Sequence, residues 1–460
     1  MDDVLGFLEQ NFDHALAGLT AFCRIPSISA VPSHRHDVMR CAIHLHGAMM
    51  RYGATKAGIY PDWGHPVVSG EWSAGRPDAP TVLVYGHYDV QPVDHLEAWQ
   101  SPPFEPEIRD GYLYGRGTVD DKGQVWMHLM AIEAWRRTRG ELPITIKMVV
   151  EGEEESEGTS LVSFLAAHGK ELAPDAIVIS DTAMVARGVP TITLGMRGLC
   201  YLEVEVESLP ADVHSGTFGG AVENPAQVLC RVLASLKNHY GQVTIPGFYD
   251  SVRSLSGRER QELDALACYE EQFRLAAGAQ QFSRGEWGYS PFTRMWRRPT
   301  LDICGLRSGF IEEGVKTIIP ARAHAKISMR LVPDQDPKEI MNATEEHLRL
   351  LTQGRAVRLS VKRLDSGRPY LADRNRLAIA AAQRALFRAF GRETVFAYEG
   401  GSIPALKTFA DMFGKPCVLF GFGLPDEQSH GPNERLLLDN FRLGMKSCAL
   451  LYDELSRMNK

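Results

Sequence analysis

Residues 82–92 read Val-Leu-Val-Tyr-Gly-His-Tyr-Asp-Val-Gln-Pro, an apolar run that is followed at once by polar side chains. Two more apolar runs, 144–150 and 176–179, lie further along the chain, and residues 124–137 show the apolar spacing of a helix. A further helix is predicted over residues 4–23. Buried strands that alternate with helices are typical of an α/β sheet covered by helices on both faces. We therefore predict an α/β fold.

The pattern of apolar residues changes near residue 198. Three segments then alternate between apolar and polar residues, as half-exposed strands do, and two helical segments separate them: 200–206, 323–331 and 357–361, with helices over 225–237 and 337–351. After about residue 370 the buried pattern returns, with a helix over 377–390 and a strand over 418–420. We therefore predict one domain in two parts, residues 1–197 and 369–460, interrupted by a smaller α+β domain over residues 198–368.

Composition and charge exclude several classes of protein. The 460 residues include 50 Lys and Arg against 57 Asp and Glu, so no basic excess favours a nucleic acid or an anionic membrane as a partner. The eight cysteines form no CxxC pair, which suits free thiols in a reducing compartment. The chain begins without the basic and apolar regions of a secretory signal, and no apolar stretch approaches a membrane span. We expect a soluble, cytoplasmic protein.

Polar clusters follow the predicted buried strands or open the helix between two of them: residues 86–92, 115–123, 151–158, 180–182 and 428–434. Each cluster alone has an ordinary interpretation, such as a loop, a helix cap or a solvated acidic turn. Together they put two histidines and several carboxylates where open α/β sheets bind their ligands. Imidazole and carboxylate ligands without thiolate fit zinc or manganese. Three ligand carboxylates and one bridging hydroxide would balance the charge of two divalent cations.

These motifs resemble the two-metal peptidase family that includes carnosinase, cytosolic nonspecific dipeptidase, acetylornithine deacetylase and succinyl-diaminopimelate desuccinylase. The dipeptidase branch is the best match. The segments that carry the resemblance span most of the chain and follow the order of the family: Gly86–Pro92, Gly115–Gly123, Glu154-Glu155, Asp181, Asp212–Gly216, Lys316-Thr317 with Pro320, and Gly400–Ser402. The resemblance implies a zinc-peptidase-like mixed sheet sandwiched by helices, and an inserted lid that also makes a homodimer. It implies a metallopeptidase, a protease that hydrolyses dipeptides or short peptides.

The resemblance also assigns roles in a centre of two divalent metal ions, zinc first and manganese second. The implied metal ligands are His87, Asp120, Glu155, Asp181 and His430, with Asp120 bridging the two ions. Asp89 would orient His87, and Glu154 would act as the general base for a water that bridges the ions.

Four further residues would contact the substrate by the same resemblance. His214 would reach in from the partner subunit and stabilise the oxyanion, although alone it reads as a surface histidine. Arg330 would bind the free carboxylate of the substrate, for which a guanidinium is well suited. Thr317 and Ser402 would add hydrogen bonds to the substrate backbone.

Two alignments and two functions remain open at this point. The acidic run holds Glu153, Glu154 and Glu155 in sequence, and Asp121 follows Asp120, so a shift of one residue would exchange the roles. The alternative activity is a deacylase that cleaves N-acyl amino acids with the same metal centre. A non-catalytic binding module would instead be expected to have lost a ligand or the base, and all of these residues are present.

Overall fold

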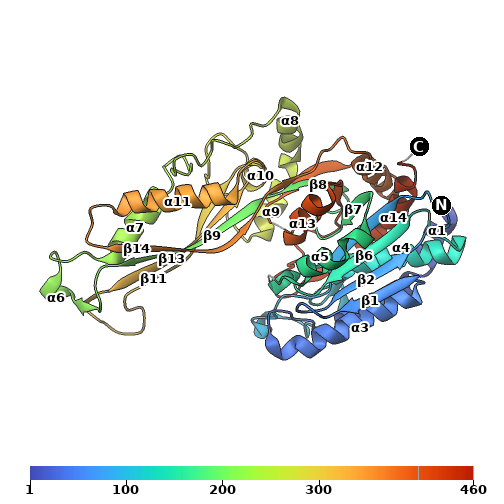
Figure 1. Cartoon of the computed structure of the whole chain (residues 1–460), viewed down its shortest axis with the longest axis horizontal. Coiled ribbons are helices and arrows are strands. Elements are labelled where there is room, and N and C mark those ends of the chain that lie inside the picture. Colours follow the sequence, from blue (N-terminus) through green and yellow to red (C-terminus); the bar gives the residue numbers. More distant parts are fainter. Residues whose placement is uncertain (157, 402, 459–460) are drawn as a thin grey trace.

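The computed structural model describes residues 1–156, 158–401 and 403–458. In it, a broad part built on a large mixed sheet is joined to a narrow, elongated part built on a smaller sheet (Figure 1). The N-terminus and the last described residues, 438–458, lie on the broad part (Figure 1). The sequence-based prediction of an α/β fold with a mixed sheet between helices is confirmed.

The large sheet has nine strands in the described part of the chain, in the order β1-β2-β6-β3-β7-β17-β8-β15, with β16 also paired to β8. The strands are β1 (Lys56–Tyr60), β2 (Val67–Trp72), β3 (Thr81–His87), β6 (Thr145–Glu151), β7 (Ala176–Ile179), β8 (Thr191–Met196), β15 (Tyr370–Leu371), β16 (Val395–Glu399) and β17 (Cys417–Leu419). The central strands β6, β3, β7 and β17 run parallel to one another. Their carboxyl ends therefore meet at one edge of the sheet.

The central strands are apolar throughout because helices cover both faces of the sheet. On β3, Val82 and Val84 belong to one core, and Leu83 and Tyr85 belong to the core on the opposite face. The first core is covered by α1 (Asp2–Gln10), α2 (Phe12–Cys23), α3 (Arg35–Arg51), α4 (Lys122–Arg139), α12 (Leu377–Phe390) and α14 (Leu438–Leu455). The second is covered by α5 (Ser160–Leu172) and α13 (Pro404–Phe413).

The prediction of one helix over residues 4–23 is wrong, because Asn11 divides the segment into α1 and α2. The side-chain amide of Asn11 donates to the carbonyl oxygen of Phe7 at 2.8 Å, while its backbone leaves the helical conformation. Asparagine side chains compete with helical backbone hydrogen bonds in this way.

The smaller sheet is antiparallel, in the order β11-β13-β9-β14. Its strands are β9 (Gly198–Glu207), β11 (Thr300–Ser308), β13 (Arg322–Leu331) and β14 (Arg358–Gly367). One face packs on α7 (Pro225–Ser235) and α11 (Pro337–Thr352), which explains why every second residue of β9 is buried. The sequence did not predict β11, an edge strand whose residues are mostly exposed and do not alternate.

Short elements complete the chain. They are β4 (Glu107–Arg109), β5 (Tyr112–Tyr114), β18 (Arg435–Leu437), β10 (Val213–His214), β12 (Ile318–Ile319), α6 (Ser215–Phe218), α8 (Gly257–Ala265), α9 (Glu270–Ala276), α10 (Pro291–Trp296), and the 3₁₀ helices Pro32–His34, Leu96–Ala98, Glu154–Ser156 and Leu266–Tyr269. No described helix is both long enough and apolar enough to cross a membrane.

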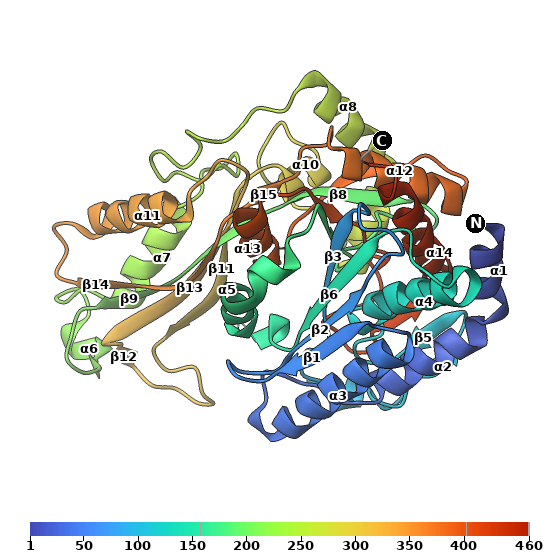
Figure 2. The ribbon, with the colours of Figure 1, turned by 45° about the vertical axis from the view of Figure 1, so that its right-hand side comes forward.

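Two adjacent connections join the sheets. Strand β8 continues into β9 through Arg197 alone, and β14 returns to β15 through residues 368–369 (Figure 2). A side chain at Gly198 would meet the carbonyl oxygen of Gly367 at 2.5 Å, so only glycine allows the two connections to pack this closely. Arg197 therefore lies at the junction of the two parts of the molecule.

Candidate metal centre

The candidate ligands gather at the carboxyl edge of the parallel strands. His87 ends β3, Glu155 lies in the turn after β6, and Asp181 lies two residues beyond β7. His430 lies in the loop that follows β17, and Asp120 lies two residues before the start of α4. The geometry thus brings together residues that are more than 300 positions apart in the sequence.

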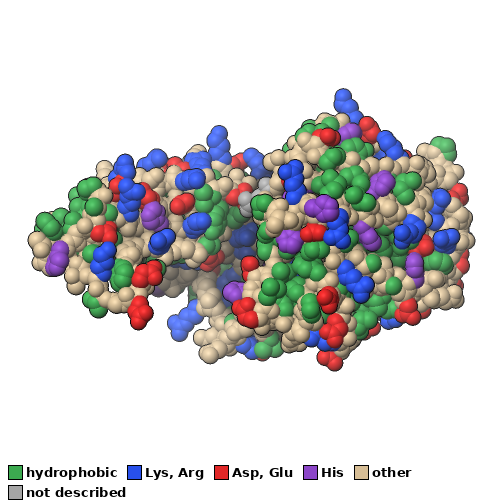
Figure 3. All heavy atoms as spheres, turned by 90° about the horizontal axis from the view of Figure 1, so that it is seen from below, with side chains coloured by type: hydrophobic (Ala, Val, Ile, Leu, Met, Phe, Trp, Pro, Cys, Tyr) green, Lys and Arg blue, Asp and Glu red, His purple; other side chains and the backbone are tan. Residues whose placement is uncertain are grey.

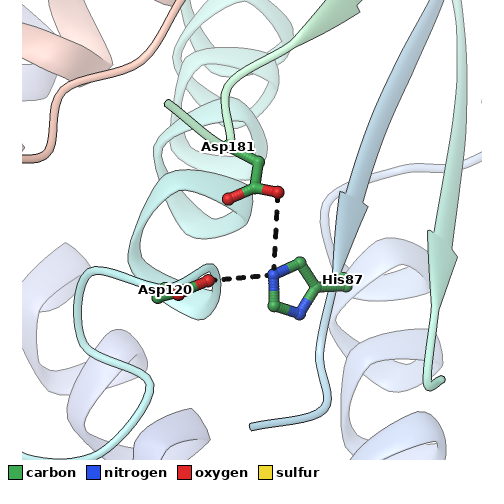
Figure 4. Close-up of side chains that lie close together, drawn as sticks. All are labelled: His87, Asp120 and Asp181. Atoms are coloured by element: carbon green, nitrogen blue, oxygen red, sulfur yellow. Dashed lines mark hydrogen bonds and ion pairs between the residues drawn. The ribbon is translucent and has the colours of Figure 1, made fainter. Parts of the chain in front are cut away.

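The first group of ligand atoms comes from His87, Asp120 and Asp181, which lie within 4.8 Å of one another. Nε2 of His87 lies 3.0 Å from Oδ1 of Asp120 and 4.0 Å from Oδ2 of Asp181. Figure 4 shows both carboxylates directed at the same ring nitrogen. These three side chains can together coordinate one cation.

The second group comes from Asp120, Glu155 and His430, again within 4.8 Å of one another. Nε2 of His430 lies 3.1 Å from Oδ2 of Asp120 and 3.6 Å from Oε2 of Glu155. Asp120 therefore belongs to both groups and turns one carboxylate oxygen toward each histidine. That is the geometry of a carboxylate that bridges two ions.

Asp89 holds the first group in place without belonging to it. Nδ1 of His87 lies 3.1 Å from the carbonyl oxygen of Asp89, which leaves Nε2 facing the other ligands. The fully buried carboxylate of Asp89 accepts hydrogen bonds from the hydroxyl of Ser29 at 2.6 Å and from the backbone amides of Glu154 and Glu155. Asp89 thus ties the turn that carries Glu154 and Glu155 to the strand that carries His87.

The three consecutive glutamates have different surroundings. The carboxylate of Glu153 accepts from the backbone amides of His65 at 2.7 Å and Ser160 at 3.1 Å, so it anchors the start of α5. Glu155 lies in the second ligand group. Glu154 is half-buried and close enough to His87 and Asp181 for their charges to influence its pKa. This arrangement favours Glu155 as ligand and leaves Glu154 free for proton transfer.

Asp120 and Asp121 also differ, although they are neighbours. Only Asp120 faces both histidines, whereas Oδ2 of Asp121 accepts from the backbone amide of His87 at 3.2 Å. Asp121 is fully buried, and burial raises its pKa well above the usual range of a carboxyl group. Asp121 therefore supports the backbone of His87, and Asp120 remains the candidate bridge.

The site brings several carboxyl groups together, and burial opposes their ionisation. Burial, followed by the charge of Asp120, raises the pKa of Asp181 to about 7 and that of Glu155 to about 8. Burial also raises the pKa of Glu154 well above its ordinary value. Burial works against ionisation of Asp120 too, but hydrogen bonds with His430 and His87 outweigh it and lower the pKa of Asp120.

Burial alone would lower the pKa of a histidine, but carboxylate neighbours raise the pKa of both histidines in this site. The hydrogen bond with Asp120 is the main reason why the pKa of His430 rises to about 9. Burial would lower the pKa of His87, but its carboxylate neighbours outweigh burial and raise it. Such a cluster holds protons near neutral pH unless cations replace them. Imidazole nitrogens and carboxylate oxygens without thiolate are ligands that suit zinc or manganese, so these residues fit two divalent cations.

A buried ion pair between Arg116 and Glu434 supports the loop of Asp120, and the sequence analysis assigned no role to either residue. Nη1 of Arg116 lies 2.9 Å from Oε2 of Glu434, and both side chains are almost completely buried. Glu434 accepts from the backbone amides of Gly117, Val119 and Asp120 at 2.8, 3.0 and 3.2 Å. Arg116 donates to the carbonyl oxygen of Ser429 at 2.6 Å. The pair thus connects the loop of Asp120 to the loop of His430.

The remaining predicted residues lie away from this cluster or outside the described residues. His214 and Thr317 lie together at the far end of the smaller sheet, where β10 pairs with β12 beside α6 (Figure 1). Both side chains are exposed. Arg330 lies at the other end of that sheet, next to the junction with the large sheet. Ser402 lies outside the described residues.

Comparisons with known proteins give a consistent result. The model described as "Peptidase family M20/M25/M40" matches residues 83–454. The Beta-Ala-His dipeptidase of Homo sapiens is 31% identical over all of this chain and 93% of its own length. The Cys-Gly metallodipeptidase dug1 of Schizosaccharomyces pombe is 30% identical over all of this chain and 99% of its own length. The crystal structure of human carnosine dipeptidase 1 superposes with a TM-score of 0.85 at 30% identity, covering 99% of this chain and 98% of that one.

Proposed function

Because the chain belongs to peptidase family M20/M25/M40, whose members use divalent metal ions, we propose that it hydrolyses the amide bond of dipeptides or short peptides. It is a metallopeptidase of the dipeptidase type. The observation that carries the proposal is the pair of ligand groups that share Asp120. A pair of divalent cations that share one carboxylate ligand is typical of metal-assisted hydrolysis.

The side chains of this chain suit the proton transfers of that reaction. When bound, two divalent cations acidify a water between them and polarise the scissile carbonyl. Glu154 would take a proton from the water as its oxygen bonds to the carbonyl carbon and gives a tetrahedral oxyanion. It would then deliver that proton to the nitrogen of the departing amine as the C–N bond breaks and the carbonyl re-forms. Asp89 would keep His87 and the turn of Glu154 aligned throughout.

Arg330 would bind the free carboxylate of the substrate. Its guanidinium is half-buried at the end of β13 nearest the junction, and no described carboxylate forms an ion pair with it. Ser402, outside the described residues, would hydrogen-bond to the substrate backbone in our proposal. A bidentate guanidinium–carboxylate contact fixes both position and orientation of the ligand.

We place His214 in the active site of a second copy of the chain. Within one chain His214 lies at the far tip of the smaller sheet, so a homodimer through residues 198–368 would be needed to present it to a metal centre. Thr317 would arrive with it, because the carbonyl oxygen of Thr317 accepts from the backbone amide of Ser215 at 3.0 Å. Its proposed role is a hydrogen bond to the substrate, while His214 would stabilise the oxyanion.

Mixing two inactive variants tests this sharing. We expect His214→Ala protein and Glu154→Gln protein each to be nearly inactive, and their mixture to recover up to about a quarter of wild-type turnover if subunits exchange at random. Recovery requires a dimer site that combines Glu154 of one chain with His214 of the other. Activity measured after co-expression checks this, and no recovery in a verified heterodimer would place His214 outside the shared site.

The activity itself is tested with a substrate panel after metal removal. We expect chelation to abolish turnover, zinc to restore it, and manganese to restore it less well. The panel compares dipeptides, tripeptides and N-acyl amino acids at equal concentration. Faster cleavage of N-acyl amino acids than of dipeptides would favour the alternative, a deacylase with the same metal centre. Full activity after verified metal removal would contradict the mechanism.

We propose that residues 1–197 and 369–460 form the catalytic domain and that residues 198–368 form the lid, because the two sheets divide near these positions. A cytoplasmic location is proposed from the eight free cysteines, which suit a reducing compartment.

A further inference from the structure

A basic pocket lies beside the junction of the two sheets, outside the metal centre. Its volume is about 270 Å³, and the charged side chains that line it are Arg197, Lys237, Arg294, Arg298, Glu286 and Asp302. Arg298 is neutralised by Glu286 through contacts of 2.6 and 2.8 Å, and Nζ of Lys237 lies 3.4 Å from Asp302. The pocket therefore retains two positive charges, those of Arg197 and Arg294.

Among the described residues, the hydrogen-bond partners of the two remaining arginines are neutral groups. Nε of Arg197 donates to the carbonyl oxygen of Gly400 at 3.2 Å, and its Nη1 lies 3.4 Å from the hydroxyl of Thr300. Nη1 of Arg294 donates to the carbonyl oxygen of Ser283 at 2.7 Å. Across residues 1–156, 158–401 and 403–458, neither guanidinium forms an ion pair with a carboxylate. A buried or half-buried guanidinium without an anionic partner is costly, so an anion that enters the pocket would relieve that cost.

Arg197 lies between the metal centre and the proposed carboxylate anchor. On one side it contacts Gly400, which follows Glu399, and Glu399 lines a cavity together with Asp120 and Asp181. On the other side it contacts Thr300, the cross-strand partner of Arg330 on the open face of the smaller sheet. Burial and then the charge of Arg330 lower the pKa of Arg197 to about 10, although the charges of Asp302 and Glu399 act in the opposite direction. Figure 3 shows a hollow between the broad and narrow parts, with Lys and Arg side chains inside it.

We propose that this pocket receives the side chain of the substrate's C-terminal residue and selects aspartate or glutamate there. The inference rests on the proposed function, since Arg330 must hold the α-carboxylate for the adjoining side chain to point at Arg197. Arg197 and Arg294 then pair with the second carboxylate. A neutral side chain of equal size fits the pocket but leaves both charges unpaired, so discrimination arises from charge and not from shape.

Matched dipeptides test the proposal, because glutamate and glutamine have nearly the same shape. We expect kcat/KM for Ala-Glu to exceed that for Ala-Gln by about tenfold or more, the usual effect of a charge-assisted hydrogen bond in a half-buried site. Arg197→Met should lower the ratio of the two kcat/KM values several-fold, because only Arg294 then pairs with the second carboxylate, whereas Arg197→Lys should keep more of the preference. Arg294→Met should lower the same ratio and provides an independent answer if Arg197→Met does not fold.

An arginine outside the pocket provides the control. Arg349 is exposed on α11, where it pairs only with Glu345 at 3.4 Å, so Arg349→Met should leave the Ala-Glu to Ala-Gln ratio unchanged. Equal hydrolysis of Ala-Glu and Ala-Gln by the wild type would overturn this inference and leave dipeptide hydrolysis standing. A preference that stays undiminished in both pocket variants would also overturn it. Hydrolysis of no dipeptide by the metal-loaded protein would instead overturn the proposed function, and this inference with it.

Discussion

Replacing Glu154 with glutamine is expected to lower kcat by about 10²–10⁴-fold while the protein keeps both metal ions, because only the proton acceptor is removed. Glutamine has the size of glutamate but cannot take a proton from water. Glu154 lies in neither group of ligand atoms, so the donor set for the ions is unchanged. Steady-state kinetics together with metal analysis of the purified variant would check both parts of the prediction.

The neighbouring glutamate provides a matched control. Glu153→Gln makes the same chemical change one position earlier, where the carboxylate anchors α5 through the amides of His65 and Ser160. We expect the loss of one of these bonds to lower the free energy of unfolding by about 1 kcal/mol and to leave turnover close to that of the wild type. The opposite pattern, with Glu153→Gln inactive and Glu154→Gln active, would move the base by one residue.

Replacing Asp120 with asparagine is expected to abolish turnover and to weaken the binding of both metal ions by more than about 100-fold. Loss of a residue that only supports a ligand costs roughly 10–100-fold, and Asp120 itself contributes to both ligand groups. Asparagine supplies one neutral oxygen where the carboxylate presents two charged ones. Calorimetric titration of the metal-free protein with zinc measures the effect directly.

Asp121→Asn is the corresponding control for that experiment. Asparagine retains an oxygen that can accept from the backbone amide of His87, and it matches the neutral form that burial favours at Asp121. We therefore expect Asp121→Asn to bind two metal ions. A variant that loses both ions at this position, while Asp120→Asn retains them, would assign the bridge to Asp121.

The parts of the fold that the sequence predicts well are those with strong periodicity. The apolar runs at 82–85, 144–150 and 176–179 lie in adjacent parallel strands, so the clusters that follow them were expected at one edge of the sheet. Strand β11 was not predicted, because an edge strand with exposed residues has no alternating pattern. The break at Asn11 was also missed, since apolar spacing continues across it.

The candidate site was predicted from motif order more than from local pattern. Nothing in the spacing of residues alone distinguishes Glu153 from Glu154, whereas hydrogen bonds to His65 and Ser160 separate them at once. The pair of Arg116 and Glu434 has no periodic signature either, because each residue lies within a loop that is far from the other in sequence. Contacts of this kind become visible only when the chain is folded.

The same pair has a consequence for biosynthesis. Glu434 supplies the acceptors for three amides of the loop that carries Asp120, yet it follows Arg116 by 318 residues. While a ribosome is still translating the segment between them, the nascent chain already holds Asp120 and His87 but lacks the carboxylate of Glu434 that accepts from the loop. We therefore expect the protein to acquire its metal ions late, once residues around His430 have emerged from the exit tunnel and docked. Until then the growing polypeptide lacks His430 and with it the second group of candidate ligand atoms.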